Sequence, residues 1–132
     1  MSLAFVSCGK ATTEDEYVRV AISKTSYSSY EEIWFEITFK EWVVWGSHCS
    51  IWFEEKINQA WQKVGECRPP NYEAESWPIG DGEQVQFTMP AVSPENSYYT
   101  YSLSPGIYRL AIVYSSGNRS VTSYSPEFKL EP

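Results

Sequence analysis

The sequence predicts an all-β protein that folds as an antiparallel β-sandwich of about seven strands with Greek-key connections. Short segments alternate apolar and polar residues and are separated by turn residues, whereas no segment repeats its apolar residues with the period of a helix. The aromatic fraction is 17%, with six Trp and ten Tyr, and such residues favour pleated strands. Long connections between some strands favour a sandwich over an up-and-down barrel. The 132 residues suit one domain with one hydrophobic core.

Residues 1–16 are expected to precede the folded domain, which we place at 17–132. Residues 1–3 look like an expression leader, and the apolar tract over 3–9 has a small residue just before Cys8. That tract resembles the lipobox of a bacterial lipoprotein signal peptide, which implies that Cys8 is lipidated. An incidental apolar N-terminus is the open alternative. The polar and acidic residues 10–16 would form a tether to the lipid.

The first two strands, over residues 17–23 and 32–40, alternate cleanly and are separated by a loop rich in Ser and Tyr. Their inward residues are Val18, Val20 and Ile22 in the first, and Ile33, Phe35, Ile37 and Phe39 in the second. The segment from Trp42 to Gly46 lacks alternation where a polar turn is expected. It is either a bulged strand or an aromatic loop.

A hairpin is expected to follow, with arms over residues 47–55 and 60–67. Equal counting outward from Asn58 sets Cys49 directly opposite Cys67, and opposite residues of an antiparallel pair lie close enough for a disulfide. We therefore predict a Cys49–Cys67 disulfide, although one β-bulge would shift the register by a residue. An oxidising location and a lipidated Cys8 would leave these two thiols to pair with each other.

The remaining strands follow a long acidic loop over residues 72–81. Residues 82–90 alternate again, with Val85, Phe87 and Met89 inward, and residues 91–104 form a long crossing connection. The next strand is expected up to Tyr114. The last one spans 120–130 and is interrupted at Pro126, which indicates an edge or a bulge there.

The strand before Tyr114 begins at a sharp corner formed by Pro105 and Gly106. Tyr108 follows at once and shares its inward face with Leu110 and Ile112. A Tyr at such a place resembles the tyrosine corner of immunoglobulin-like (Ig-like) sandwiches. The resemblance implies that Tyr108 is buried and that its hydroxyl binds backbone between residues 102 and 106.

Several short motifs, taken in order, resemble a bacterial Ig-like domain of the type found in cell-envelope lipoproteins. They span most of residues 17–130 and are Lys24–Tyr27, Gln59–Val64, Gly82–Glu83, Ser104–Leu110 and Glu127–Leu130. The sequence departs from the pattern at Trp42–Trp45 and at Cys67–Asp81. The resemblance implies an Ig-like sandwich that serves as an accessory or interaction module, either lipid-anchored in the envelope or periplasmic. Fold analogy by itself supplies no activity.

The sequence offers little material for catalysis or cofactor binding, so we predict neither an enzyme nor a cofactor. His48 is the only His, and its neighbour Cys49 would point to the opposite face of a strand, which disfavours a Cys–His dyad. The three Cys lack C-x-x-C spacing and the carboxylates lack a calcium-loop pattern. The net charge of −7 argues against nucleic acid, and a lipid on Cys8 is the one membrane contact expected.

The six Trp exceed what one sandwich core readily holds, so some of them are expected at the surface. We predict that Trp42 and Trp45 belong to the largest exposed apolar patch, and the candidate binding residues are Trp42, Trp45, Tyr98, Tyr99 and Tyr101. The alternative is that these rings only cover the ends of the sandwich.

Three functions are compatible with these features. The first is an envelope interaction module that binds a protein partner through exposed loops or the aromatic patch. The second is a carbohydrate-binding module that uses Trp42, Trp45 and neighbouring Tyr as a platform, and the third is a secreted protease inhibitor that presents residues 98–101 as a loop. We expect the first because it requires the fewest additional features.

Overall fold

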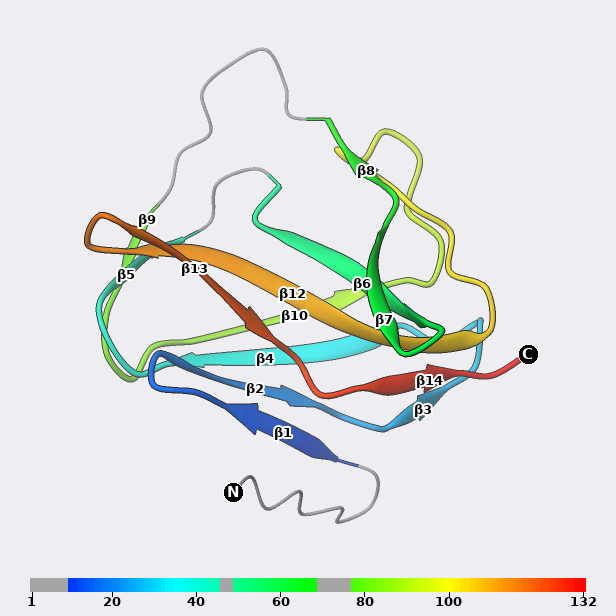
Figure 1. Cartoon of the computed structure of the whole chain (residues 1–132), viewed down its shortest axis with the longest axis horizontal. Helices are drawn as coiled ribbons and strands as arrows, with labels where there is room; N and C mark the ends of the chain where they lie inside the picture. The colour runs from blue at the N-terminus through cyan, green and yellow to red at the C-terminus, as the bar shows by residue number, and fades with distance from the viewer. Residues whose placement is uncertain (1–9, 46–48, 69–76) are drawn as a thin grey trace.

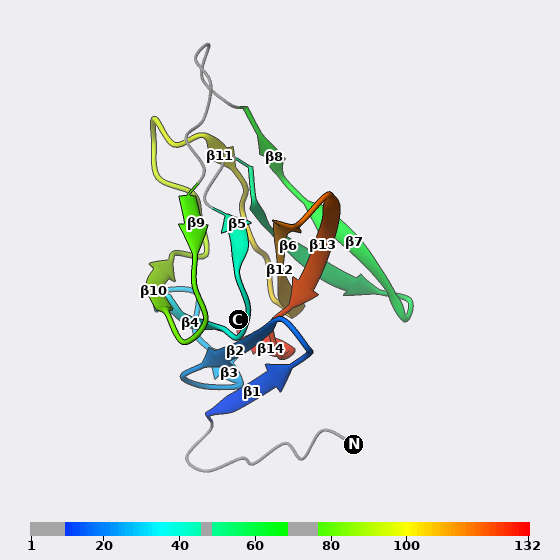
Figure 2. The same ribbon diagram turned by 90° about the vertical axis from the view of Figure 1, so that its left-hand side faces the viewer.

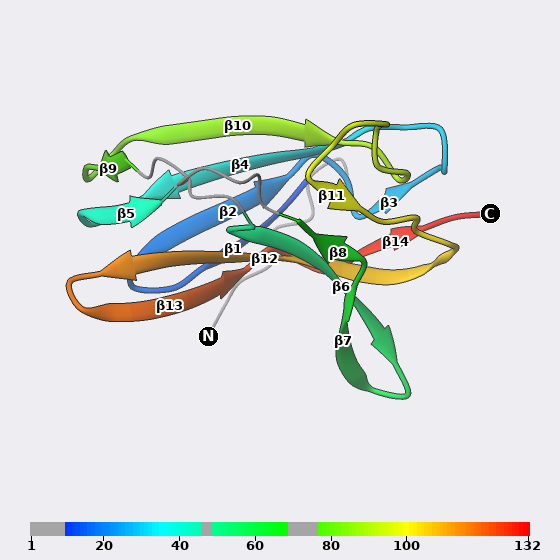
Figure 3. The same ribbon diagram turned by 90° about the horizontal axis from the view of Figure 1, so that it is seen from above.

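A computed structural model of the chain shows an all-β fold, and the structure describes residues 10–45, 49–68 and 77–132. Those residues contain no helix, and their strands form two main sheets and one short pair (Figure 1). Seen from above, β4 and β10 lie in one layer, and β12 and β13 lie in the other (Figure 3). The arrangement is sandwich-like, as the sequence predicts.

The first sheet is antiparallel and has four strands in the order β1-β2-β4-β10. Its strands are β1 (Ala11–Glu14), β2 (Val18–Ile22), β4 (Ile33–Phe39) and β10 (Gln84–Met89). The predicted alternation is confirmed in β4, where every second side chain from Ile33 to Phe39 is buried. In β10 the inward side chains Val85 and Phe87 are only half-buried, and Met89 is buried.

The second sheet is built around the longest strand, β12 (Gly106–Ser116). On one side lie β13 (Arg119–Tyr124) and β14 (Phe128–Leu130), and on the other lie β5 (Val43–Trp45) and β6 (Ile51–Ile57). The outer strands are β9 (Trp77–Ile79) beside β5 and β7 (Ala60–Val64) beside β6. The short β3 (Ser26–Tyr27) runs parallel to β14, and β8 (Glu66–Cys67) pairs with β11 (Tyr99–Thr100).

The core lies between the two sheets. Its largest fully buried side chains are Tyr27, Tyr108, Phe35, Phe39, Phe53, Phe128, Ile22, Ile33, Ile37, Leu110, Ile112 and Leu130. Six of these are Phe or Tyr rings, and five of the six contact one another around Phe35 and Phe128, in edge-on, tilted or stacked arrangements. Apolar burial of this extent is the main stabilising term of such a fold.

The expected tether over residues 10–16 needs correction, because Ala11 to Glu14 form β1. Each residue of β1 pairs with a residue of β2, from Ala11 opposite Ile22 to Glu14 opposite Arg19. The polar composition of this tract suits an edge strand, in which only the Ala11 side chain is buried. The folded unit therefore begins before residue 17.

The hairpin of β6 and β7 forms with a register one residue away from the predicted one. Its turn residues Asn58 and Gln59 have φ values of 53° and 66°, as a two-residue turn with both residues left-handed requires. Phe53 consequently lies opposite the apolar Val64, whereas equal counting from Asn58 would set it opposite Lys63. The hairpin projects away from the sandwich (Figures 2 and 3).

The interruption predicted at Pro126 is confirmed as a bulge between β13 and β14. Ala111 lies opposite Tyr124 and Tyr108 opposite Phe128, so two residues of the last strand face Arg109 alone. The Ser125 hydroxyl accepts a hydrogen bond from the Leu110 N–H at 2.8 Å, which satisfies the backbone where the ladder breaks.

The corner that begins β12 has the predicted tyrosine. The Tyr108 ring is buried, and its hydroxyl donates to the Ser104 carbonyl oxygen at 2.5 Å. The ring stacks near Phe128 with centroids 6.1 Å apart. The prediction for Tyr108 is confirmed.

Candidate functional site

Trp42 lies at one end of the sandwich, in the connection between β4 and β5. The β9–β10 and β12–β13 connections reach the same end, whereas the C-terminus lies at the opposite end (Figure 1). The Trp42 side chain is 68% exposed, and Val44 in β5 is 43% exposed. Val44 lies opposite the exposed Pro78 of β9 in the ladder, so an apolar surface continues from the connection onto these two short strands.

The indole of Trp42 is seated on the backbone of Gly80. A Cβ atom added at Gly80 would lie 3.3 Å from Trp42 Cζ2 and 3.5 Å from Glu83 Oε1. The absence of a side chain at Gly80 therefore lets the ring and the Glu83 carboxylate lie side by side above the chain. The exposed Glu41 and Asp81 flank the same connections. We call Trp42, Val44 and Pro78, with their acidic rim of Glu41, Asp81 and Glu83, the Trp42 site.

Trp45 does not join this surface. It belongs to β5 and alternates with Val44, so its side chain points toward the core, where its ring lies 5.7 Å from that of Phe39. Its Nε1 is buried and has no hydrogen-bond partner in the part of the chain that the structure describes. The expectation that Trp42 and Trp45 share one exposed patch is corrected for Trp45, because the segment is a strand rather than a loop.

The three candidate Tyr residues also separate. Tyr101 is only 8% exposed, its hydroxyl donates to the Pro90 carbonyl oxygen at 2.8 Å, and its ring lies 5.1 Å from that of Phe53. Tyr101 is therefore a core residue, and burial raises its pKa to about 12. Tyr99 is half-buried and Tyr98 is exposed, but β11 lies away from β5 along the molecule (Figure 3). None of the three Tyr completes the Trp42 site.

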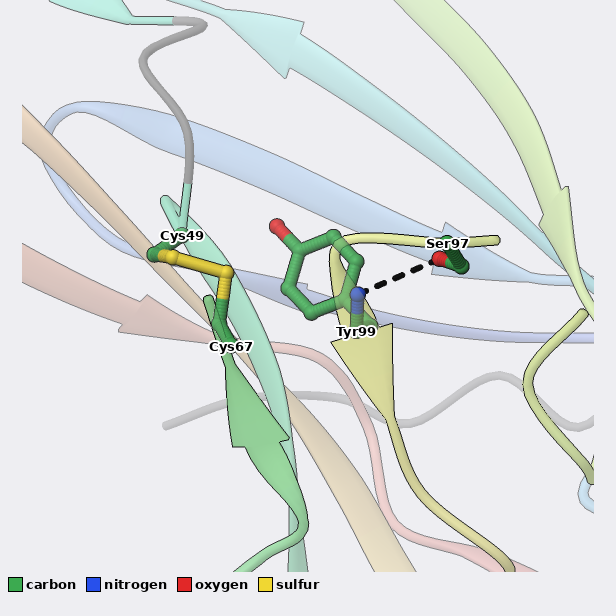
Figure 4. Close-up of a disulfide and its surroundings, with 4 residues drawn as sticks. All are labelled: Cys49, Cys67, Ser97 and Tyr99. Carbon is green, nitrogen blue, oxygen red and sulfur yellow. Dashed lines mark hydrogen bonds between the residues drawn. A yellow bond between two sulfur atoms is a disulfide. The ribbon is translucent and has the colours of Figure 1, made fainter. Parts of the chain in front are cut away.

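The predicted disulfide joins Cys49 to Cys67, with Cα atoms 5.6 Å apart. It forms although the hairpin register differs from the prediction, because Gly65 adopts a φ of 80° and ends the pairing with β6. Cys67 then pairs with Tyr99, whose ring lies beside the bridge (Figure 4). Burial raises the pKa of Tyr99. Cys8 and His48 lie outside the described residues.

A second aromatic surface covers the outer face of β6, β7, β12 and β13, and the sequence analysis missed it. The Arg109 guanidinium carbon lies 3.7 Å from the centroid of the Tyr124 ring and 4.2 Å from that of Trp61. Glu54 Oε1 accepts hydrogen bonds from Arg109, and Trp52 Nε1 donates to Glu54 Oε2 at 2.9 Å. We call these five residues the Arg109 stack.

The sequence contains a signal for this stack, namely alternate aromatic and charged residues in the two arms of the hairpin. This signal predicts the stack only when the register of β6 with its two neighbouring strands is known, because that register places Glu54 between Lys63 of β7 and Arg109 of β12. Lys63 Nζ lies 4.6 Å from the centroid of the Trp52 ring. The chain's own cations therefore already occupy the faces of these rings, so the stack is not an open platform for a ligand.

A groove between β1 and β13 combines apolar and polar side chains, and its lining residues are Thr13, Glu14, Asp15, Val18, Val20, Thr122, Ser123 and Tyr124. The Ser123 hydroxyl donates to Asp15 Oδ2 at 2.6 Å and lies 2.6 Å from the Tyr114 hydroxyl. The other oxygen of Asp15 accepts hydrogen bonds from the N–H groups of Tyr17 and Val18. These groups satisfy one another, and their evident role is to join the edges of the two sheets.

The described part of the chain contains no group of three or more His, Cys, Asp or Glu side chains that could hold a metal ion. Within the same residues no helix has the length and apolar character needed to cross a membrane. The disulfide is compatible with an exported protein.

Comparisons of the chain with protein-family models, with curated proteins and with solved structures give no match. The geometry of the site is therefore the ground on which a function can be proposed.

Proposed function

We propose that the chain is a non-catalytic interaction module with an Ig-like fold that acts in the cell envelope and binds a protein partner through the Trp42 site. One observation carries the proposal: the Trp42 ring is 68% exposed although the core is filled without it. A large aromatic side chain in such a position, seated on a glycine and flanked by Val44 and Pro78, has the character of an interface anchor.

The strand pairings support the Ig-like part of the proposal. The segments β2, β4, β6, β7–β8, β10, β12 and β13–β14 overlap the seven expected strands, and β1, β3, β5, β9 and β11 are additional to them. The chain crosses from β10 in one sheet to β12 in the other. Between β2 and β4, which belong to the first sheet, it also forms β3, which pairs parallel with β14 of the second sheet. Connections that cross between the two sheets also occur in Greek-key sandwiches, and the Tyr108 corner is a second feature that supports an Ig-like fold.

An exported location is supported by the Cys49–Cys67 disulfide, since such bonds persist in oxidising compartments. The lipobox-like tract before Cys8 suggests the means of attachment, through a lipid on that residue. In this proposal the protein is either anchored to the envelope or periplasmic.

The geometry favours a protein partner over a glycan. A carbohydrate platform needs coplanar exposed rings, whereas Trp42 is exposed and Trp45 points toward the core. The acidic rim of Glu41, Asp81 and Glu83 calls for a partner whose apolar hollow is bordered by Lys or Arg. The protease-inhibitor alternative has weaker support, because residues 98–101 include β11 and a core Tyr and are not presented as a free loop.

The experiment places a photo-cross-linking amino acid at Val44 and irradiates cells that export the full chain. We expect one discrete protein adduct, which is lost when Trp42→Ala is added and weakens when Asp81→Asn and Glu83→Gln remove part of the rim. A cross-linker at Tyr30, which is 96% exposed outside the site, is the matched control and should give no such adduct.

Adducts at Val44 that persist with Trp42→Ala, or equal labelling from Tyr30, would contradict the proposal. Purified wild-type protein is also compared with Trp42→Ala on a glycan array. Glycan binding that depends on Trp42, with no protein adduct, would replace the protein partner by a carbohydrate. The melting temperature of Trp42→Ala should stay within about 2 °C of wild type, as expected for an exposed position.

A further inference from the structure

The strand β10 forms one edge of the four-stranded sheet and pairs only with β4 among the described strands. The Phe39 N–H donates to the Glu83 carbonyl oxygen at 2.9 Å, just before β10 begins. Hydrogen-bonded pairs alternate along an antiparallel ladder, so Val85, Phe87 and Met89 direct their backbone groups toward β4. The N–H and C=O groups of Gln84, Gln86 and Thr88 consequently point outward from the edge.

This edge lacks the protection that edge strands normally have. Residues 84–89 contain no charged residue, no Pro and no bulge, and their register with β4 is unbroken. Although the chain as a whole carries a net charge of −7, the residues of this edge strand carry none. The inward side chains Val85 and Phe87 also remain half-exposed, because no described strand covers them from this side.

We propose that β10 pairs antiparallel with β10 of a second copy of this chain, around a twofold axis at Gln86. In this register Gln86 faces Gln86 of the second copy, and Gln84 faces Thr88. The outward residues Gln84, Gln86 and Thr88 each donate one backbone hydrogen bond and accept one. The two four-stranded sheets then join into one continuous sheet across the axis.

The side chains fit this register on both faces. On the core face Val85 lies beside Phe87 of the second copy as a non-hydrogen-bonded pair, in which Cβ atoms approach to about 5 Å. Each half-exposed apolar side chain is thereby covered by the other. On the outer face only uncharged side chains meet across the axis, and the Gln86 amide stays bonded to Glu36 of its own chain at 2.7 Å.

The pattern of polar and apolar residues in β10 is the reason for proposing a second copy of this chain as the partner strand. A twofold interface brings the same surface together from both chains, so the surface must complement itself. Reading outward from Gln86, the residues are apolar on both sides at 85 and 87, and polar on both sides at 84 and 88. No pair in this register opposes two like charges, which matters for two chains that each carry a negative net charge.

The test measures self-association of the full chain by sedimentation velocity over a range of concentrations, with charge placed at the flanking pairs. Gln84→Lys with Thr88→Lys sets Lys opposite Lys on both sides of the axis and should weaken dimerisation at least about tenfold. Gln84→Lys with Thr88→Glu sets Lys opposite Glu and should restore it. Within one chain these two positions are four residues apart, so each single chain should fold in both variants, as circular dichroism can verify.

The register is checked by Gln86→Cys in a Cys8→Ser background, where mild oxidation should yield a disulfide-linked dimer. The central pair brings Cα atoms to about 5.5 Å, within the range for a disulfide. Thr38→Cys, on β4 one strand from the edge, is the control and should give no such dimer. A wild-type chain that stays monomeric up to about 1 mM overturns the proposal. A Lys–Lys variant that associates as tightly as wild type overturns it too. The proposal is also wrong if β10 is found paired with a strand of another protein instead of with β10 of a second copy.

Discussion

At Tyr108 a single hydroxyl closes the corner from which the longest strand begins. Removing it in Tyr108→Phe leaves the Ser104 carbonyl oxygen without its 2.5 Å partner while the ring still fills the core. A buried acceptor that loses its hydrogen bond costs about 1–2 kcal/mol, so we expect the free energy of unfolding in urea to fall by that amount. Tyr30→Phe, at a fully surface-exposed ring, should leave the value unchanged. Equal stability of Tyr108→Phe and wild type would show that the hydroxyl has no role in the corner.

The corner could be predicted from the sequence because its determinants are local, namely Pro105, Gly106 and a Tyr on the inward face. The inward orientation of the Trp45 side chain could not be predicted from the sequence. Which of Trp42 and Trp45 points toward the core depends on Val43 to Trp45 being a strand, and that strand exists because β12 and β9 pair with it. The sequence contains no alternation there from which to infer the inward face.

At the scale of elements, the Arg109 stack attaches the projecting hairpin to the rest of its sheet. In Arg109→Ala the rings of Trp61 and Tyr124 lose the cation between them, and the mostly buried Glu54 carboxylate loses its ion pair and keeps only the hydrogen bond from Trp52. We expect a loss of about 2–3 kcal/mol in the free energy of unfolding, together with a change in Trp fluorescence. Arg119→Ala, at an exposed position of β13, should change it by less than about 0.5 kcal/mol. Similar effects of the two substitutions would contradict the role assigned to the stack.

The disulfide is the second link at this scale, since it joins the start of β6 to β8, which leaves the hairpin for β11. The sequence separation of 18 residues predicts a contribution of about 3 kcal/mol on a chain-entropy argument. Cys49→Ser with Cys67→Ser should therefore shift the urea midpoint to lower concentration. Cys8→Ser should leave the midpoint where it is. An unchanged midpoint in the double variant would contradict this prediction, because it would mean that the disulfide does not reduce the conformational freedom of the unfolded chain.

The pairing of the two Cys residues was predictable, but the route to it was not. Equal counting from Asn58 gave a register that is wrong by one residue in the hairpin, because the two-residue turn lies at Asn58 and Gln59. The positive φ of Gly65 then redirects the chain, so that Cys67 approaches Cys49 outside the β6–β7 ladder. From the sequence alone, one cannot tell whether a single glycine within a hairpin arm shifts the register or ends the pairing of the arm.

For the whole molecule, the hydroxyl groups that join and fill the sandwich determine how stability changes at high pH. Burial raises the pKa of Tyr114 to about 12, and the Ser123 hydrogen bond opposes part of that rise. Tyr101 has its pKa raised to about 12, again chiefly by burial. In the unfolded chain both phenols titrate near the ordinary value of about 10.

A phenol whose pKa is higher in the folded state than in the unfolded state stabilises the fold only while it is protonated. Its contribution is complete below about pH 10 and is lost as the pH rises toward about 12, because the unfolded chain releases the proton first. We therefore expect that these two phenols make the free energy of unfolding fall between about pH 10 and pH 12 and leave it constant near neutral pH.

Tyr114→Phe should lower the free energy of unfolding by about 1 kcal/mol at pH 7, because the hydrogen-bonded chain from Tyr114 through Ser123 to Asp15 loses its first hydroxyl. The same substitution should make the decrease at alkaline pH shallower. Urea unfolding at a series of pH values, with tyrosinate absorbance followed in parallel, checks both effects. An alkaline fall that is equally steep with and without the Tyr114 hydroxyl would mean that this phenol does not titrate in the folded protein as its burial between the sheets requires.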